Sequence, residues 1–340
     1  MKKWIVSMIL FVVVSVFTAC GTEDEVVKEE EQAASKELHK MKMASWSKPI
    51  AEQSNLFLAQ EKEWFTDAGI EFEYVPGAGG GDAVKNIIAG NADIAFADLE
   101  AVLLAVENGA DLKVIYNIYP HNVFNLVSLN EQGIETVEDL RGKDVGVYSF
   151  TSGTYQNLKL LLYNAGMTEE DVHVIETGVL NFGPLMNGQV AATAATDTGL
   201  YDAEQKGLEA VDVIEAKEVL NTPSDVFVVT EETFEQKQDL LIDFLQVYRD
   251  SVNYTIEHPD EAAKAAVDTA IDGQDQARNE EIIQIRNQVS VNEQMKEKGL
   301  GWFDQALIQR VEDTYVEMGL LEEPVGIDTI VSNELVEQLQ

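Results

Sequence analysis

Cysteine is almost absent from this sequence, and histidine is rare. One cysteine, Cys20, and four histidines occur in 340 residues. A single thiol can form neither an internal disulfide nor a metal site built from several cysteines. The histidines are too widely spaced to match a metal signature such as His-Glu-x-x-His. We therefore expect no disulfide scaffold, no metal centre and no cofactor.

Basic residues are also few. The sequence has 23 Lys and Arg against 61 Asp and Glu, a formal net charge of −38. Removing Lys2 and Lys3 with the leader described below leaves 21 basic residues and a net charge of −40. Such a charge repels nucleic acid and anionic lipid, which excludes binding to a phosphate backbone. Solubility outside the cell, for example in a saline or alkaline habitat, is the simplest reason for the acidity.

Long apolar runs are missing except at the N-terminus. Lys2 and Lys3 precede an apolar run over residues 4–17, and Thr18-Ala19-Cys20 follows it. The run is too short for a comfortable membrane span, whereas a positive start, an apolar centre and a small-residue end describe an export signal. Residues 1–19 are therefore predicted to be a signal peptide.

Cys20 follows this signal directly, with Gly21 next. The stretch resembles the lipobox of bacterial lipoproteins, in which the cysteine is lipidated and becomes the mature N-terminus, although Phe17 replaces the usual leucine. The resemblance implies a lipid anchor at the outer face of the cytoplasmic membrane, which acyl chains can provide. A plain signal peptide that ends near Ala19 is the alternative. Residues 20–40 lack an apolar stripe and are predicted to be a disordered acidic tether.

Strand and helix patterns alternate from residue 41 onward, which favours an α/β fold with a largely parallel sheet. The alternation starts afresh after residue 124, and the stretch from Gly90 to Asp98 has an imperfect echo from Gly188 to Asp197. Single cores stop growing at about 250–300 residues, so two lobes are expected. Lobe 1 is predicted to contain residues 41–124 and 229–340, and lobe 2 residues 125–228. Helices are expected over residues 235–257, 260–271, 278–288 and 302–318.

The stretch from Val75 to Asp98 contains the run Gly79 to Gly81. It reads as a strand end, a glycine loop, a helix that opens at Asp82, and a buried strand that ends at Asp98. Ligands of open α/β sheets lie at the carboxyl ends of the strands, so this stretch is a candidate ligand-binding wall. The Gly-Lys-Ser/Thr of a P-loop is missing, which argues against nucleotide hydrolysis. Alternatively, the glycines only form a tight turn and Asp98 only caps a helix.

Five segments carry a resemblance to a known family. They are residues 63–74, 76–98 and 137–147, Ser152-Gly-Thr, and Gly188-Gln-Val. The most specific part is Asp139-Leu-Arg-Gly-Lys, followed by a strand and a Ser-Gly loop. Together the segments resemble the substrate-binding proteins of ABC importers in the nitrate, sulfonate, taurine and thiamine-pyrimidine group. The sequence departs from that group at Ala191, where an aspartate like Asp93 is usual.

The resemblance implies a type II periplasmic-binding-protein fold. In such a fold two α/β lobes are joined by crossover strands, here near residues 123–129 and 225–230, and extra C-terminal helices complete the first lobe. The lobes close on a small ligand by hinge motion, because the closed form alone makes the full set of contacts. The implied partners are a small molecule and the permease and ATPase subunits of an importer, and the receptor is expected to be a monomer and not an enzyme.

The candidate ligand-binding residues lie at predicted strand-to-helix turns that would face the cleft. In the first lobe they are Ser45, Trp46, Ser47, Gly79, Gly80, Gly81, Asp82, Asp98, Tyr119, His121 and Asn122. The others are Phe150, Thr151, Ser152, Gly153, Thr154, Asn181, Phe182, Asp197 and Thr198 in the second lobe, and Asp225 near the return crossover.

Three of these features bear on the ligand. Trp46 could stack on a flat or apolar ligand, or could belong to the hinge or core. The Ser152-Gly-Thr segment at a helix start suits an anionic group, or is ordinary N-capping. Carboxylates at Asp98, Asp197 and Asp225 disfavour a bare anion and accept hydrogen bonds from amines or ring N–H groups, unless they only cap helices. An amine-bearing heterocycle, such as a thiamine pyrimidine precursor, is favoured over a sulfonate, taurine or nitrate.

A surface-anchored enzyme or adhesin on the same fold is the alternative to a receptor. The serines near the predicted cleft have no base and orienting acid that can be identified from the sequence. A related fold does serve as a pyrimidine-forming enzyme, but that branch relies on a cysteine-rich motif, and the mature chain here has no cysteine beyond Cys20. The sequence therefore favours capture of a small molecule without turnover.

Overall fold

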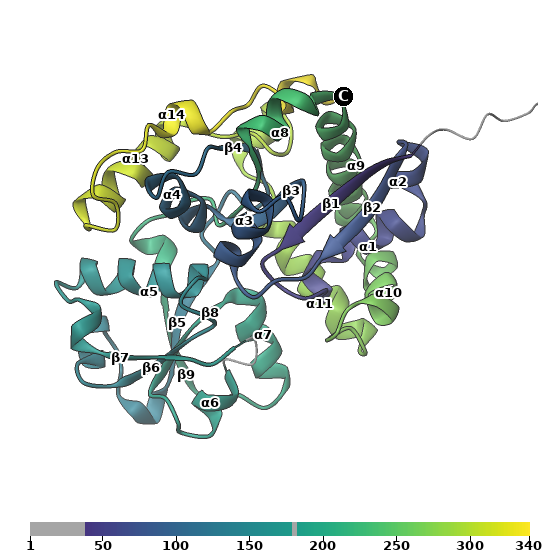
Figure 1. Ribbon diagram of the computed structural model, residues 1–340. Coiled ribbons are helices and arrows are strands. Elements are labelled where there is room, and N and C mark those ends of the chain that lie inside the picture. The colour runs from purple at the N-terminus through teal and green to yellow at the C-terminus, as the bar shows by residue number, and fades with distance from the viewer. Residues whose placement is uncertain (1–37, 179–181) are drawn as a thin grey trace, which may run out of the picture. The chain divides into compact units, whose positions relative to one another are not determined.

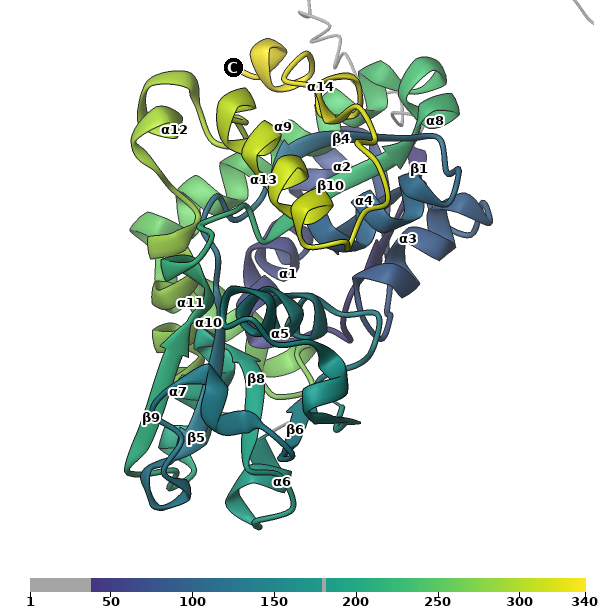
Figure 2. The same ribbon diagram turned by 90° about the vertical axis from the view of Figure 1, so that its left-hand side faces the viewer.

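The computed structural model describes residues 38–178 and 182–340. The predictions for the leader, for Cys20 and for Asn181 lie outside these residues, as does most of the predicted tether. The described residues belong to one compact unit, Glu37–Gln340. Its strands form two five-stranded sheets with helices packed around them (Figures 1 and 2).

The first sheet is mixed and has the strand order β2–β1–β3–β10–β4. Strand β1 pairs in parallel with β2 and β3, whereas β10 pairs antiparallel with β3 and β4. Alternation along β1 buries Met41 and Met43 on one face, as the two-residue period of a strand requires. The strands are β1 (His39–Ser45), β2 (Ile70–Val75), β3 (Ile94–Asp98), β4 (Leu112–Asn117) and β10 (Asp225–Thr230).

The second sheet is also mixed and has the order β7–β6–β8–β5–β9. Strand β6 pairs in parallel with β7 and β8, and β5 pairs antiparallel with β8 and β9. The strands are β5 (Phe124–Leu129), β6 (Asp144–Val147), β7 (His173–Glu176), β8 (Ala192–Thr196) and β9 (Val211–Glu215).

In each sheet the four strands other than the crossover strand run in the same direction, so the prediction of a largely parallel sheet is confirmed. Both crossover strands were also correctly predicted as strands. The chain leaves the first sheet into β5 and returns as β10, and each of these strands runs antiparallel to both of its neighbours. All of β10 belongs to the first sheet, so the chain has rejoined that sheet by Asp225.

Helices surround both sheets, and the long C-terminal ones pack mainly beside the first (Figures 1 and 2). Those before β10 are α1 (Ser54–Glu61), α2 (Trp64–Asp67), α3 (Gly80–Ile88), α4 (Leu99–Glu107), α5 (Gly153–Asn164), α6 (Phe182–Met186) and α7 (Asp197–Gln205). Those after it are α8 (Glu231–Gln236), α9 (Gln238–Glu257), α10 (Pro259–Thr269), α11 (Gln276–Val289), α12 (Glu293–Lys298), α13 (Gln305–Glu317) and α14 (Ile327–Ile330).

The short 3-10 turns complete the elements. They are η1 (Ala51–Gln53), η2 (Asn130–Gln132), η3 (Val137–Leu140), η4 (Glu169–Asp171), η5 (Ala216–Glu218) and η6 (Val336–Gln338). The four predicted C-terminal helices are present. Helix α3, however, begins at Gly80 and not at Asp82, because Gly79 has φ +117°, a conformation that only glycine adopts readily, and forms the N-cap.

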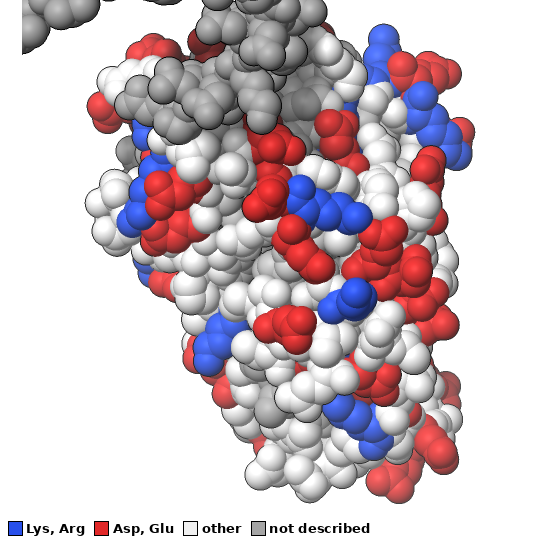
Figure 3. Space-filling view, turned by 90° about the vertical axis from the view of Figure 1, so that its right-hand side faces the viewer, with Lys and Arg blue, Asp and Glu red and all other residues white. Residues whose placement is uncertain are grey.

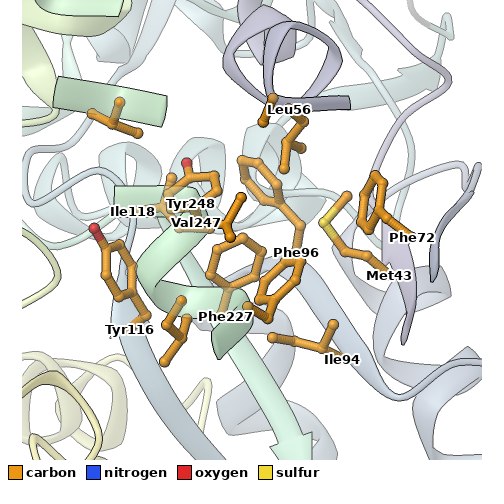
Figure 4. Close-up of a cluster of buried hydrophobic side chains, with 14 of the residues drawn as sticks. Met43, Leu56, Phe72, Ile94, Phe96, Tyr116, Ile118, Phe227, Val247 and Tyr248 are labelled. Carbon is orange, nitrogen blue, oxygen red and sulfur yellow. The ribbon is translucent and has the colours of Figure 1, made fainter. Parts of the chain in front are cut away.

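The largest core lies between the first sheet and helices α1, α9, α10 and α11. Stacked aromatic side chains dominate it: Phe65 lies on Phe72 with ring centroids 4.4 Å apart, and Phe227 meets Tyr248 edge to face at 4.7 Å. Figure 4 shows Phe227 beside Phe96 of the adjacent strand and next to Tyr248 of α9. This packing fixes the carboxyl ends of β1 and β3, and thereby the residues that follow them.

The surface carries the expected acidic excess. Asp and Glu side chains are spread over the face in Figure 3, with fewer Lys and Arg among them. In the described part of the chain, no helix is long and apolar enough to cross a membrane, and no group of three or more His, Cys, Asp or Glu could hold a metal ion.

Candidate functional site

A cavity of about 810 Å³ lies where the ends of both sheets meet helix α11. Its size falls within the range of about 300–1,000 Å³ that is usual for small-molecule pockets. Trp46 after β1, Asp98 at the end of β3, Tyr148 after β6 and Thr198 of α7 all line it. The carboxyl-end loops of both sheets therefore contribute, as expected for an α/β ligand site.

Asp98 is the most enclosed carboxylate of the cavity. It is 3 % exposed, and its Oδ1 has no hydrogen-bond partner. It occupies the N-cap position of α4 but makes no capping hydrogen bond with its side chain. The capping hydrogen bond considered from the sequence is therefore absent, and Oδ1 is without a partner.

Asp225 lies directly opposite Asp98, because these two residues are partners in the antiparallel pairing of β10 and β3. Burial raises the pKa of Asp98 to about 7, and the nearby backbone N–H groups of Asp98 itself, Ala101, Gly80 and Gly153 oppose this rise. Burial also raises the pKa of Asp225 well above its ordinary value, and the charges of Asp98 and Glu52 add to the effect. The pair therefore favours neutral carboxyls or a ligand that donates protons or carries positive charge.

Glu100, in the first turn of α4, forms a buried hydrogen-bonded group behind this pair. Its Oε1 accepts hydrogen bonds from Tyr315 Oη of α13 (2.9 Å) and Asn157 Nδ2 of α5 (3.2 Å), while its Oε2 has no partner. Burial, and then the charge of Asp98, raises the pKa of Glu100 to about 8. Asn157 Oδ1 in turn accepts a hydrogen bond from Asn122 Nδ2 at 2.8 Å. This group thus connects α4, α5, α13 and the first crossover.

A second buried group links α11 to both sheets. Arg286 Nη2 lies 3.0 Å from Glu52 Oε2 of η1 and 2.8 Å from Thr198 Oγ1 of α7, and its Nη1 pairs with Asp197. Thr198 Oγ1 also donates to Glu52 Oε2 at 2.8 Å. We call these four residues the Arg286 cluster. Its hydrogen bonds and ion pairs connect α7, which lies beside the second sheet, to η1 and α11, which pack beside the first sheet.

The basic side chains that line the cavity are already paired with acids. Arg286 has Glu52 and Asp197, Arg278 has Asp202 and Asp272, and Lys206 has Asp202. The lining carboxylates are Glu52, Asp98, Asp202, Asp225, Asp272, Asp275 and Glu281. The cavity therefore offers free acceptors in excess of free cations.

Trp46 provides the aromatic contact of the cavity from the first sheet. Its ring meets that of Tyr148 edge to face, with centroids 6.3 Å apart, and its Nε1 is buried without a hydrogen-bond partner. The ring also packs at the edge of the large core, so both roles considered from the sequence apply in part. A buried indole N–H without a partner is a donor available to a ligand.

Nine of the predicted ligand residues line the cavity. They are Trp46, Gly79, Gly80, Asp98, Ser152, Gly153, Thr154, Thr198 and Asp225. Ser152 and Thr154 are engaged locally, since their hydroxyls are 2.7 Å apart and Thr154 Oγ1 accepts from the Tyr148 N–H. Ser152 is the N-cap of α5 but makes no side-chain capping hydrogen bond, so these hydroxyls hold the loop before α5 rather than cap the helix.

Other predicted residues support the wall without lining it. Ser45 and Ser47 bond to each other and to Gln53 or Lys48. The Gly81 N–H donates to Thr151 O at 3.1 Å, so these two join α3 to the loop before α5. Asp82 accepts from the Ala78 N–H, and Asp197 pairs with Arg286.

The remaining predicted residues lie further from the cavity lining, and the sequence pattern did not separate them from the others. The ring of Tyr119 is covered by Arg286, and His121 and Asn122 bond to Asn221 near the crossovers. Phe150 is largely exposed beside Tyr155, and Phe182 is buried in a core of the second sheet. Strand-to-helix turns thus indicate the correct edge but not which side chains face inward.

The contribution of α11 and η1 was missed. Glu52, Arg278 and Arg286 line the cavity, but they lie outside the strand-to-helix turns used for prediction. One signal was present: Arg286 follows the buried Ile282 and Ile283 by four and three residues, which places a charge on the apolar face of the helix. A charged residue in such a position needs a buried partner.

Comparison with known proteins shows which family the chain belongs to. The model of a family described as NMT1/THI5 like matches residues 51–262. The chain belongs to this family. Among curated proteins, it is 27 % identical over 239 residues to the riboflavin-binding protein RibY of Chloroflexus aurantiacus, covering 69 % of this chain and 68 % of that one. It is 24 % identical over 216 residues to a putative thiamine biosynthesis protein of Haemophilus influenzae, covering 62 % and 68 %.

Among solved structures, the fold of this chain resembles that of the alkanesulfonate-binding protein SsuA of Xanthomonas axonopodis pv. citri bound to MOPS. The TM-score is 0.69 at 16 % identity, with 87 % of this chain and 99 % of that one covered. The fold is therefore that of periplasmic solute-binding proteins, with two mixed α/β sheets and added C-terminal helices, as the sequence predicted.

Proposed function

We propose that this NMT1/THI5-like protein is an extracytoplasmic receptor that captures a nitrogen-rich heterocycle and delivers it to an ABC importer. One observation carries the ligand class: Asp98 Oδ1 and Glu52 Oε1 are buried at the cavity without partners, while the lining cations are already paired. Two buried acceptors without donors favour a ligand that brings N–H groups.

The aromatic lining agrees with a flat ligand. Trp46 offers a ring and an unpartnered N–H, and Tyr148 offers a second ring in edge-to-face contact with it. The names of the two curated relatives refer to riboflavin and to thiamine biosynthesis, both of which involve nitrogen heterocycles. A sulfonate, taurine or nitrate fits the unpaired carboxylates less well, because each would meet them as an anion.

The proposed receptor is exported, anchored to the membrane and coupled to an importer. Residues 1–19 would direct export, Cys20 would carry the lipid anchor at the outer face of the cytoplasmic membrane, and residues up to 40 would tether a monomeric receptor. The two sheets would form lobes that close on the ligand by hinge motion and then present it to the permease and ATPase subunits.

The ligand can be identified directly. The protein without residues 1–36 is purified, whatever co-purifies is extracted, and mass spectrometry identifies it. In a thermal-shift panel of flavins, aminopyrimidines, amines, sulfonates and nitrate, we expect only nitrogen heterocycles to raise the melting temperature. A ligand at 100 times its dissociation constant should add about 2.7 kcal/mol to the free energy of unfolding. Melting temperatures unmoved by the whole panel, formation of a product, or binding only to cell surfaces would contradict the receptor.

Substituting Trp46 by alanine is expected to weaken ligand binding about tenfold while changing stability little, because the ring contributes stacking and the N–H a hydrogen bond. Calorimetric titration with the identified ligand measures the affinity, and thermal melting measures the stability. Trp64→Ala is the matched control, since Trp64 is half-buried against Tyr254 and does not line the cavity. A large loss of stability with unchanged affinity in Trp46→Ala would assign the ring to the core.

A further inference from the structure

Three helices begin around the carboxylate of Asp98. Helix α3 begins at Gly80, α5 begins at Gly153, and Asp98 itself is the N-cap of α4. The backbone N–H groups of Gly80 and Gly153 both act on the Asp98 carboxyl and favour its ionised form. Helices α3 and α4 flank the first sheet, whereas α5 packs against β5 and β8 of the second. The carboxylate thus lies where helices from both sheets begin.

The fit around this carboxylate is tight. A Cβ atom added at Gly80 would lie 1.8 Å from Asp98 Oδ2, so only glycine allows α3 to begin there. A Cβ added at Gly153 would lie 2.3 Å from the ring of Phe124. Helix N-termini attract anions through their free N–H groups and their dipole. The position that would suit an anionic group of a ligand is therefore already filled by a side chain.

The carboxylate also has a face toward the cavity. Asp98 lines the cavity although it is only 3 % exposed. Its Oδ1 has no hydrogen-bond partner. Asp225, the cross-strand partner, lines the same cavity without beginning a helix. An anionic ligand group at this end would have to displace Asp98 or share its site with it, and both are unfavourable.

We propose that Asp98 is a resident anion that determines ligand specificity. Its carboxylate fills the meeting point of the α3, α4 and α5 N-termini and thereby excludes sulfonate, sulfate and carboxylate groups from this end of the cavity. It presents Oδ1 to an N–H donor of the ligand. The inference rests on the proposed receptor function and names the residue that selects the ligand class. Removing the carboxylate should leave an anion site in its place.

The test measures anion binding and needs no knowledge of the natural ligand. The full chain, solubilised in detergent, is titrated calorimetrically with sulfate and with ethanesulfonate at about pH 8.5. At this pH Asp98 is ionised, because burial raises its pKa only to about 7. The unchanged protein should bind neither measurably. Asp98→Ala should bind sulfate measurably, at least about tenfold more tightly than the detection limit that the unchanged protein does not reach. Asp98→Ser, which also vacates the site but retains a small capping group, should show the same gain and serves if the alanine variant does not fold.

Asp225→Ala is the matched control, because it removes a buried carboxyl group from the same cavity at a position where no helix begins. No gain of sulfate binding is expected for it. An equal gain in Asp225→Ala would show that net charge alone matters, and no gain in folded Asp98→Ala and Asp98→Ser would show that the helix N-termini form no anion site; either result overturns the proposal. Failure of every heterocycle to bind the unchanged protein would instead contradict the receptor function and leave the sulfate result intact.

Discussion

Replacing Arg286 by alanine is expected to lower the free energy of unfolding by about 3–5 kcal/mol, the usual effect of breaking a buried ion pair. Arg286 is 3 % exposed and is bonded to Glu52 and Thr198, with Asp197 as a further ion-pair partner. Burial alone would lower its pKa, but Asp197 and Glu52 more than offset this and raise it. Without the guanidinium, the Glu52 carboxylate remains buried and uncompensated.

Chemical denaturation at neutral pH measures this loss. Arg310→Ala on α13 is the matched control, because Arg310 is an exposed helical arginine, and its substitution should change the free energy of unfolding by less than about 1 kcal/mol. The double variant Glu52→Gln, Arg286→Met should recover part of the loss, since it removes both buried charges together. A loss in Arg286→Ala no larger than that in Arg310→Ala would contradict the buried role of the Arg286 cluster.

Raising the pH from about 5 to about 9 is expected to destabilise the ligand-free protein by a few kcal/mol. The pKa of Asp98 rises to about 7 and that of Glu100 to about 8, in both cases chiefly because of burial. The folded state therefore retains protons that the unfolded state releases near pH 4. The stabilisation is fully present below the unfolded pKa values and is lost as the pH rises through the folded ones.

Glu100→Gln separates this effect from other titrations. Glutamine resembles the protonated acid and can still accept from Tyr315 and Asn157, so the variant should lose the part of the dependence between pH 5 and 9 that Glu100 contributes. The parts from Asp98 and Asp225 should remain, because burial raises the pKa of both. Glu317→Gln, an exposed substitution on α13, should retain the whole dependence. Thermal melting across this pH range checks both. Equal pH dependence in the two variants would show that Glu100 ionises freely in the folded protein.

Several features of the fold could be predicted because they depend on local pattern. The two-residue alternation of β1, the buried strand that ends at Asp98 and the four long C-terminal helices were all recognised. The reversed direction of the two crossover strands was not, because apolar runs such as Phe124–Leu129 and Asp225–Thr230 have the same composition whichever way they run. The start of α3 was misplaced by two residues, because Gly79 and Gly80 adopt conformations that sequence preference does not distinguish.

The candidate site was only partly predictable for a related reason. Residues on strand ends, such as Trp46 and Asp98, follow from the α/β pattern. Arg286 lies 234 positions from its partner Glu52, and no local period connects them. Inward and outward side chains of one turn, such as Thr198 and Asp197, also differ only through the packing of α7 against α11.

The sequence by itself determined the fold class, the acidic character and the edge of the sheets where a ligand would lie, because composition and periodicity are properties of neighbouring residues. Only the tertiary structure decided that Asp98 and Asp225 are cross-strand partners, that the helices α3, α4 and α5 begin around one carboxylate, and that the lining cations are already paired. These depend on contacts between distant segments, and burial there changes which charges a ligand can meet. The stretch from Val75 to Asp98 is thus one wall of the cavity, and the buried Oδ1 of Asp98 is its acceptor without a partner.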